Sequence, residues 1–256
     1  MSELRGPSAS DFPRTPQDLL ARRLRGLVPL GNEGSAAIAE FPMSTVSVAR
    51  GEDLVVPGEE GTLPFIVLQG WLLAYRLTAD GTRQMLDIFL TGDLGNLRSL
   101  VLPTTDVFIS AATDVQVARF AVDDFHLLIQ RYPRFATALL WMVALRRSRF
   151  FEHMVSLGRR KADARIGHFL AELFVRADVA GLIDSQGFMC PLKLGEIADF
   201  VGLTREHTSR VVGQLRHAGL IETRDNRIFV PNLERLMTTF DIDAAYLHLD
   251  ETPIVS

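Results

Sequence analysis

The stretch that decides the fold is Leu194-Gly195-Glu196-Ile197-Ala198-Asp199-Phe200-Val201-Gly202-Leu203-Thr204-Arg205-Glu206-His207-Thr208-Ser209-Arg210-Val211-Val212-Gly213-Gln214-Leu215. Its first half places apolar side chains on one face at helical spacing. Gly202 is expected to end this first helix, because a left-handed cap position favours glycine. Thr204 is expected to begin the next helix as its N-cap, since its hydroxyl can accept a free backbone N–H. Two short helices joined by such a turn predict a helix-turn-helix.

The second helix of this motif has one apolar and one polar side. It buries Val211, Val212 and Leu215 and leaves polar residues near its N-terminus on the other side. Two short strands are predicted after it, over 220–223 and 227–230, with a turn at Asp225 and Asn226. A helix-turn-helix followed by a hairpin is a winged helix. The alternative is an ordinary helical hairpin with solvated charges, but the turn, the cap and the polar face coincide as a winged helix requires.

Two short motifs in this segment resemble a known family. The Thr-Arg-Glu-x-x-Ser-Arg pattern of 204–210 and the Gly-Leu-Ile run of 219–221 are similar to the DNA-binding domain of the CRP/FNR family of bacterial transcription regulators. The resemblance implies a transcription regulator rather than an enzyme. It also implies three partners, namely inverted-repeat double-stranded DNA, a second copy of the chain and RNA polymerase. The alternative function is a ligand-binding regulator that acts through protein contacts, and salt-sensitive binding to palindromic DNA distinguishes the two.

The exposed side of the second helix carries the chemistry of base recognition. Arginine can bond to the O6 and N7 of guanine, and glutamate can accept from the N4 of cytosine. The resemblance implies that Glu206 and Arg210 read the core of each half-site. Phosphate contacts need only a donor or a charge, and the wing supplies both. The expected DNA-binding residues are Thr204, Arg205, Glu206, Ser209, Arg210, Thr223, Arg224 and Arg227.

The chain from about 40 to 120 has a different sequence pattern, in which short apolar runs alternate with residues that favour turns. The runs include 65–68, 71–75, 85–89 and 115–120. Many short strands at regular spacing predict a closed or sandwiched antiparallel fold, for which a jelly roll is one solution. The motif at 65–70 is similar to a hairpin of the CRP/FNR sensor domain, and the motif at 92–94 is similar to its Gly-Asp-hydrophobic turn. The expected fold class is therefore α+β, with an antiparallel jelly-roll sensor of the cyclic-nucleotide-binding type.

A long helix is predicted from Arg134 to about Leu157, with apolar residues at steps of three and four. The resemblance implies a parallel dimer interface on this helix, and the alternative is packing against the barrel. The expected interface residues are Leu139, Met142, Arg146, Phe150, His153 and Leu157. The predicted organisation is an N-terminal helix and sensor over 1–133, a dimerisation helix over 134–158, and a winged-helix domain with a tail over 159–256.

Composition fits this organisation. The chain has 256 residues, 47% of them hydrophobic, and a net charge of −4. The global charge matters less than the local arginines, because phosphate contact depends on local charge. The single cysteine, Cys190, suits a reducing cytosol and is expected to be a buried apolar residue rather than a redox switch. No apolar run is long enough for a membrane helix, and the N-terminus lacks the apolar core of a signal peptide, so a cytoplasmic location is expected.

The ligand of the sensor is the least defined feature. The resemblance implies a Glu and an Arg-Ser pair in a cyclic-nucleotide pocket, but here Asn96 and Thr105-Asp106 stand near those positions. Cyclic AMP is therefore disfavoured, with Asn96, Leu97 and Arg98 as the weak ligand-binding candidates. No metal site is expected, because none of the six histidines lies in the predicted barrel. Haem is disfavoured for the same reason, and one cysteine cannot hold an iron–sulfur cluster. The effector stays unknown, and a barrel that binds nothing is the alternative.

Overall fold

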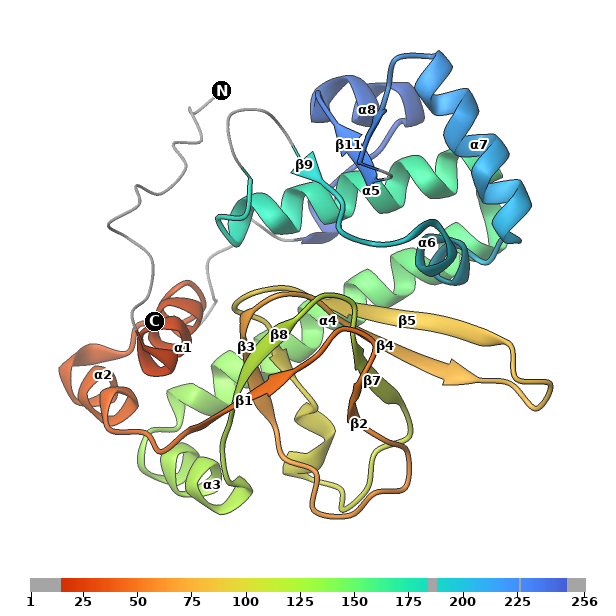
Figure 1. The fold of residues 1–256 in the computed structure, drawn as a ribbon. Helices are drawn as coiled ribbons and strands as arrows, with labels where there is room; N and C mark the ends of the chain where they lie inside the picture. Colours follow the sequence, from red (N-terminus) through yellow and green to blue (C-terminus); the bar gives the residue numbers. More distant parts are fainter. Residues whose placement is uncertain (1–14, 184–187, 226, 248–256) are drawn as a thin grey trace. The chain divides into compact units, whose positions relative to one another are not determined.

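The computed structural model of the protein describes residues 15–183, 188–225 and 227–247 (Figure 1). Outside the described residues lie 1–14 of the predicted N-terminal domain, 184–187 and 248–256 of the predicted winged-helix domain, and Asn226 of the predicted turn. The chain divides into two compact units. One holds the described residues up to Arg76 together with Asp87–Arg147, and the other holds Leu77–Leu86 together with Ser148–Leu247.

Eight strands form two four-stranded antiparallel sheets, as a jelly roll requires. The first sheet has the order β1-β8-β3-β6 and the second the order β2-β7-β4-β5. The strands are β1 (Ser44–Val48), β2 (Asp53–Val55), β3 (Phe65–Gln69), β4 (Leu72–Leu77), β5 (Arg83–Phe89), β6 (Leu94–Gly95), β7 (Phe108–Ala111) and β8 (Val115–Arg119). The predicted antiparallel sensor fold is confirmed.

Large apolar side chains from both sheets fill the interior of the jelly roll. Phe65, Val67, Leu72, Phe89 and Ile109 belong to one buried cluster. The rings of Phe65 and Phe89 meet edge to face, with their centroids 6.0 Å apart. Strands that alternate between the core and the surface bury such residues on their inner faces, so the chain itself occupies the space between the sheets.

The β3–β4 turn depends on Gly70. Its φ of +86° lies in the left-handed region, and a Cβ there would lie only 2.3 Å from the carbonyl oxygen of Asp114. Only glycine fits such a position without strain. The glycine at the end of the predicted 65–70 motif therefore allows the chain to turn tightly beside the β7–β8 connection.

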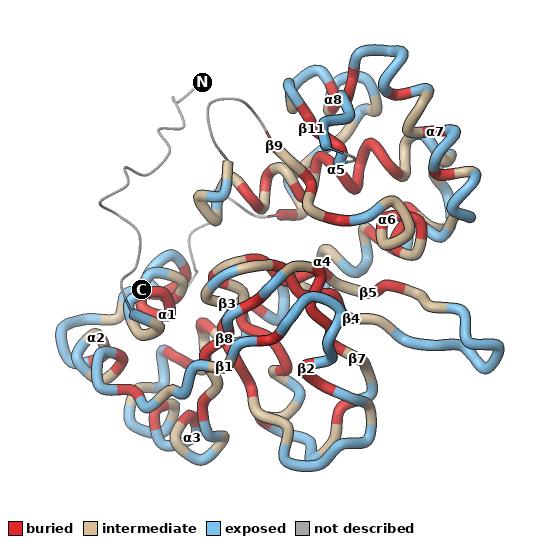
Figure 2. The backbone as a smooth tube through the Cα atoms, viewed as in Figure 1, coloured by how far each residue is buried: buried red, intermediate tan, exposed pale blue. Residues whose placement is uncertain are grey.

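Helices before, within and after the jelly roll contribute to a second buried cluster. They are α1 (Pro16–Arg25), α2 (Gly31–Ala39), the 3-10 helix η2 (Leu97–Leu100), α3 (Val122–Arg131) and the first part of α4 (Arg134–Arg159). Thr15 begins α1 with a capping box, in which its hydroxyl accepts from the backbone N–H of Asp18. Figure 2 shows this region, where buried segments of α1 and α3 alternate with exposed ones.

The other unit contains the helix-turn-helix and its supports. It is built from the second part of α4, α5 (Ala162–Val179), α6 (Leu194–Val201), α7 (Arg205–His217), α8 (Leu233–Phe240) and the 3-10 helix η3 (Ala245–Leu247). Its three-stranded sheet has the order β10-β11-β9, with β9 (Phe188–Met189), β10 (Glu222–Arg224) and β11 (Arg227–Val230). Within the described ranges, no helix is both long enough and apolar enough to cross a membrane.

Candidate nucleic-acid interface

The turn between α6 and α7 has the predicted geometry at both of its ends. Gly202 follows α6 with a φ of +64°, the left-handed conformation that ends a helix. The hydroxyl of Thr204 accepts the backbone N–H of His207 at 3.2 Å, which satisfies one of the free donors of α7. The buried hydroxyl of Thr208 donates to the carbonyl oxygen of Thr204 at 2.9 Å. These contacts fix the direction in which α7 leaves the turn.

Helix α7 separates its apolar and polar faces as predicted. Val211 and Leu215 are buried, and Val212 is half-buried. The side chains expected to contact DNA at the start of α7 are all exposed, namely Thr204, Arg205, Glu206, Ser209 and Arg210. Within the described part of the chain, neither arginine of this set has an ion-pair partner. Both guanidinium groups are therefore free to bind an external acceptor.

The wing is a hairpin, with Thr223 opposite Ile228 and Arg224 opposite Arg227. Asp225 occupies the turn with a φ of +47°. Thr223, Arg224 and Arg227 are exposed, as phosphate contacts must be. Arg224 already has partners in the chain, because it pairs with Glu222 at 2.9 Å and lies 3.5 Å from the centroid of the Phe229 ring. A phosphate contact by Arg224 would therefore have to compete with Glu222.

Polar side chains hold the end of α6. Arg83 Nε donates to the Asp199 carboxylate at 2.7 Å, and Gln84 donates to the backbone carbonyl of Asp199 at 3.0 Å. Arg165 of α5 donates to the carbonyl oxygen of Val201 at 3.3 Å. The last carbonyls of a helix have no partner within it, so such donors stabilise its C-terminus. They support the first helix of the motif.

Buried polar groups lie behind the motif. The His168 ring is buried, contacts the Glu152 carboxylate at 3.3 Å and stacks on Tyr246. Burial lowers the pKa of His168, and Arg160 lowers it further against the opposing effect of Glu172 and Glu152. The Tyr246 hydroxyl donates to Glu172 at 3.0 Å, and burial raises its pKa. These groups link α4, α5 and the segment after α8 into one polar cluster.

Cys190 is fully buried beside the wing. Its backbone N–H donates to the carbonyl oxygen of Ile228 at 2.8 Å. Burial raises the pKa of the Cys190 thiol to about 12. Because the thiolate is the reactive form, a thiol with this pKa is inert at neutral pH. The environment is the one expected of a buried apolar residue.

The predicted dimer seam on α4 is partly covered by its own chain. Met142 and His153 are buried within their own chain, and the His153 ring lies 4.1 Å from the ring of Phe200. Arg146 pairs with Asp87 at 3.0 Å and donates to the carbonyl oxygen of Leu94 at 2.7 Å. The remaining members are Leu139 and Leu157, which are half-buried, and Phe150, which is exposed. Two of the six expected residues are therefore buried inside their own chain, and the seam as a whole stays a prediction.

A neighbouring face of α4 is exposed and apolar. Its members are Leu140, Val143, Phe150, Phe151, Met154 and Val155. Leu140 is 70% exposed and Met154 53%, values that are unusual for large apolar side chains on one helix. Most of these residues recur at steps of three, four or seven, the spacing of a helix-packing stripe. Sequence periodicity alone did not separate this face from the one that packs inside the protein.

The candidate ligand residues of the jelly roll are engaged by the protein itself. Asn96 is buried in a left-handed conformation and donates to the carbonyl oxygen of Leu63 at 3.2 Å. Leu97 begins η2. Arg98 donates to the carbonyl oxygen of Thr104 at 3.1 Å and lies 3.9 Å from the Asp106 carboxylate. Asp106 also pairs with Arg76.

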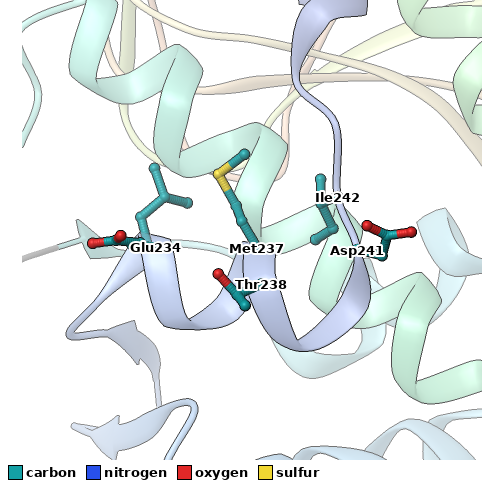
Figure 3. A pocket seen from close by; sticks show the side chains of 6 residues that line it. Glu234, Met237, Thr238, Asp241 and Ile242 are labelled. Carbon is teal, nitrogen blue, oxygen red and sulfur yellow. The ribbon is translucent and has the colours of Figure 1, made fainter. Parts of the chain in front are cut away.

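Helix α8 bears a shallow groove that sequence reasoning did not find. It is lined by Leu233, Glu234, Met237, Thr238, Asp241 and Ile242 (Figure 3). The two carboxylates on its rim would repel phosphate groups. The groove therefore has the wrong charge to extend the DNA-binding surface of α7 and the wing.

Comparisons with known proteins agree with both halves of this description. Residues 45–132 match the cyclic nucleotide-binding domain, and residues 164–239 match the Crp-like helix-turn-helix domain. The nitrogen fixation regulation protein FixK of Bradyrhizobium diazoefficiens is 32% identical over 69% of this chain and 73% of its own. The transcriptional activator protein FnrL of Cereibacter sphaeroides is 29% identical over 75% of this chain and 78% of its own.

Solved structures show the same relationship. The structure of FixK2 from Bradyrhizobium japonicum superposes with a TM-score of 0.71 at 26% identity and covers 80% of this chain and all of that one. A CRP/FNR-family regulator from Thermus thermophilus shares the fold, with a TM-score of 0.62 at 20% identity over 78% of this chain and 99% of its own. With its cyclic-nucleotide-binding type of barrel, long helix and Crp-like helix-turn-helix, the chain belongs to the CRP/FNR family of transcription regulators.

Proposed function

We propose that two copies of this protein bind an inverted-repeat operator, with one α7 helix in each of two successive major grooves. The observation that carries the proposal is the exposed N-terminal face of α7, where Arg205, Glu206 and Arg210 lie together with no competing ion pair within the described residues. These residue types read guanine and cytosine edges in the major groove. A two-fold dimer of such helices requires half-sites separated by about one helical turn of DNA.

The dimer is proposed to form through the exposed stripe of α4. A stripe containing Leu140, Val143, Phe151 and Met154 would be costly to leave in water, and burial against a second copy would remove it from solvent. Parallel pairing of α4 with its symmetry mate would direct both winged helices to the same side, as a palindromic operator requires.

Selection from a random pool of DNA duplexes tests this function directly. The wild-type protein should enrich an inverted repeat. Its affinity for that duplex should fall steeply as salt rises, because phosphate contacts release bound counterions. A duplex with only one half of the palindrome should bind much more weakly. The winged helix of the second protomer then has no half-site, so the gain from a high effective concentration is lost. Enrichment of no common sequence, or of a single half-site, would contradict the proposal.

RNA polymerase is proposed as a further partner. FnrL is a transcriptional activator, and activation requires a bound regulator to act on the transcription machinery. Transcription in a purified system from a promoter carrying the selected operator should change when the protein is added. Equal transcript yields with and without protein would contradict the proposed partner.

A further inference from the structure

The polar face of α7 has a glycine at its centre. Gly213 lies seven residues after Glu206, four after Ser209 and three after Arg210. Arg216 and His217 follow it by three and four residues, and both are exposed. Residues at these separations are neighbours on one side of a helix. The five side chains therefore surround a position that has no side chain of its own.

Among the described residues, no contact requires glycine at this position. Gly213 has no left-handed φ, so its backbone conformation is open to any residue. Apart from the neighbouring backbone of α7 itself, a Cβ built on it meets no described atom within 4 Å. Glycine in the middle of a helix is less favourable than alanine, because it loses more conformational freedom on folding. The chain thus keeps an unfavourable residue on its DNA-facing helix without an internal packing reason.

We infer that Gly213 is a positioning residue for DNA. Because it has no side chain, the sugar–phosphate backbone can approach the main chain of α7 at this position. This inference rests on the proposed docking of α7 in the major groove. The N-terminal residues of a recognition helix contact base edges, so its later turns pass the groove wall. Glycine is the residue that permits close approach of a backbone to a ligand. Arg216 and His217, one turn further along, place polar side chains beside the same strand.

The chemistry of this contact differs from base reading. A sugar–phosphate backbone is the same in every sequence, so steric contact with it affects all duplexes alike. A side chain at position 213 would hold the second half of α7 away from the groove wall. It would also move Arg216 away from the phosphates and thereby reduce the number of counterions released on binding.

The test compares Gly213→Ala and Gly213→Leu with Gly158→Ala. Gly158 lies in the last turn of α4, where a Cβ also meets nothing within 4 Å, so it reports the effect of helix propensity alone. Both alanine variants should raise the melting temperature by roughly 1–4 °C. Fluorescence anisotropy should show Gly158→Ala binding like the wild type to the duplex that the wild type selects from a random pool.

Gly213→Leu should bind both the selected duplex and a random duplex at least about tenfold more weakly, with a shallower salt dependence, and Gly213→Ala should lose less. A leucine variant that binds both duplexes as the wild type does would overturn the inference, and so would one that loses affinity only for the selected duplex. If the wild type selects no inverted repeat, the proposed function fails instead. The two failures are therefore distinguishable.

Discussion

At the scale of single residues, Arg210 is the sharpest test of base reading. Its guanidinium is exposed and has no ion-pair partner within the described chain. Replacement of Arg210 by alanine should cost about 1–3 kcal/mol of discrimination at one symmetric base pair in each half-site, because one bidentate contact is lost. Competition between the selected duplex and single-base variants measures this discrimination.

Arg210→Lys is the matched control, since it keeps the charge but not the planar fork of donors. It should retain the salt dependence of the wild type and lose part of the discrimination. If Arg210→Ala binds selected and random DNA in the wild-type ratio, Arg210 contacts phosphate or nothing.

His168 gives a prediction about pH. Its folded pKa is lowered, chiefly by burial, so the unfolded chain binds the proton more readily than the folded one. The stability that depends on neutral His168 is therefore complete above the unfolded pKa of about 6.5 and is lost as pH falls toward the folded pKa. Between pH 7.5 and 5, the melting temperature of the wild type should fall more than that of His168→Gln. Parallel pH profiles for the two proteins would exclude this role of His168.

At the scale of elements, the exposed stripe of α4 is the feature to disrupt. Leu140→Glu combined with Phe151→Glu should give a monomer, because four carboxylates would meet across the proposed interface. Operator affinity should fall when dimerisation is lost, since a monomer holds only one half-site. Light scattering measures the mass, and Leu127→Glu is the control, because Leu127 of α3 is 63% exposed but lies on a different helix. A double variant that stays dimeric would place the interface elsewhere.

The contrast between α7 and α4 shows what sequence can predict at this scale. The end of α6 at Gly202 and the start of α7 at Thr204 are local signals, and both were predicted correctly. The inner face of α4 depends on distant partners, such as Asp87 for Arg146 and Phe200 for His153. No local periodicity carries that information, so the predicted seam included residues that the chain itself covers.

The α-helices α2 and α8 were missed for different reasons. α2 contains two glycines and has no side-chain cap, so its sequence gives little helical signal. α8 did carry a signal, because Asn232 caps it by accepting the backbone N–H of Arg235 at 2.9 Å. Leu233, Leu236 and Met237 follow at helical spacing. Asparagine before such a pattern is a recognised start of a helix.

At the scale of the whole molecule, the response to cyclic AMP is expected to be absent. Arg98 lies beside the Asp106 carboxylate, which also pairs with Arg76. A cyclic phosphate would have to displace this carboxylate, and the hydroxyl of Thr105 cannot supply the missing charge. Titration calorimetry should show no saturable heat, and the affinity for the selected duplex should not change. Saturable heat with tighter DNA binding would contradict this, and Arg98→Ala should then abolish both effects.

The pairing of β9 with β11 has a consequence for the dynamics of the helix-turn-helix. β9 precedes α6 and β11 follows α7, yet Phe188 lies opposite Val230 and Met189 opposite Phe229. The two strands thus close a loop of chain that contains the whole helix-turn-helix, so we expect this ladder and both helices to open together. Backbone amides of β11, α6 and α7 should therefore exchange their hydrogens for deuterium as one cooperative group, with a common opening free energy. Amide hydrogen exchange that is much faster in α7 than in β11 would show that the recognition helix opens independently of the strands.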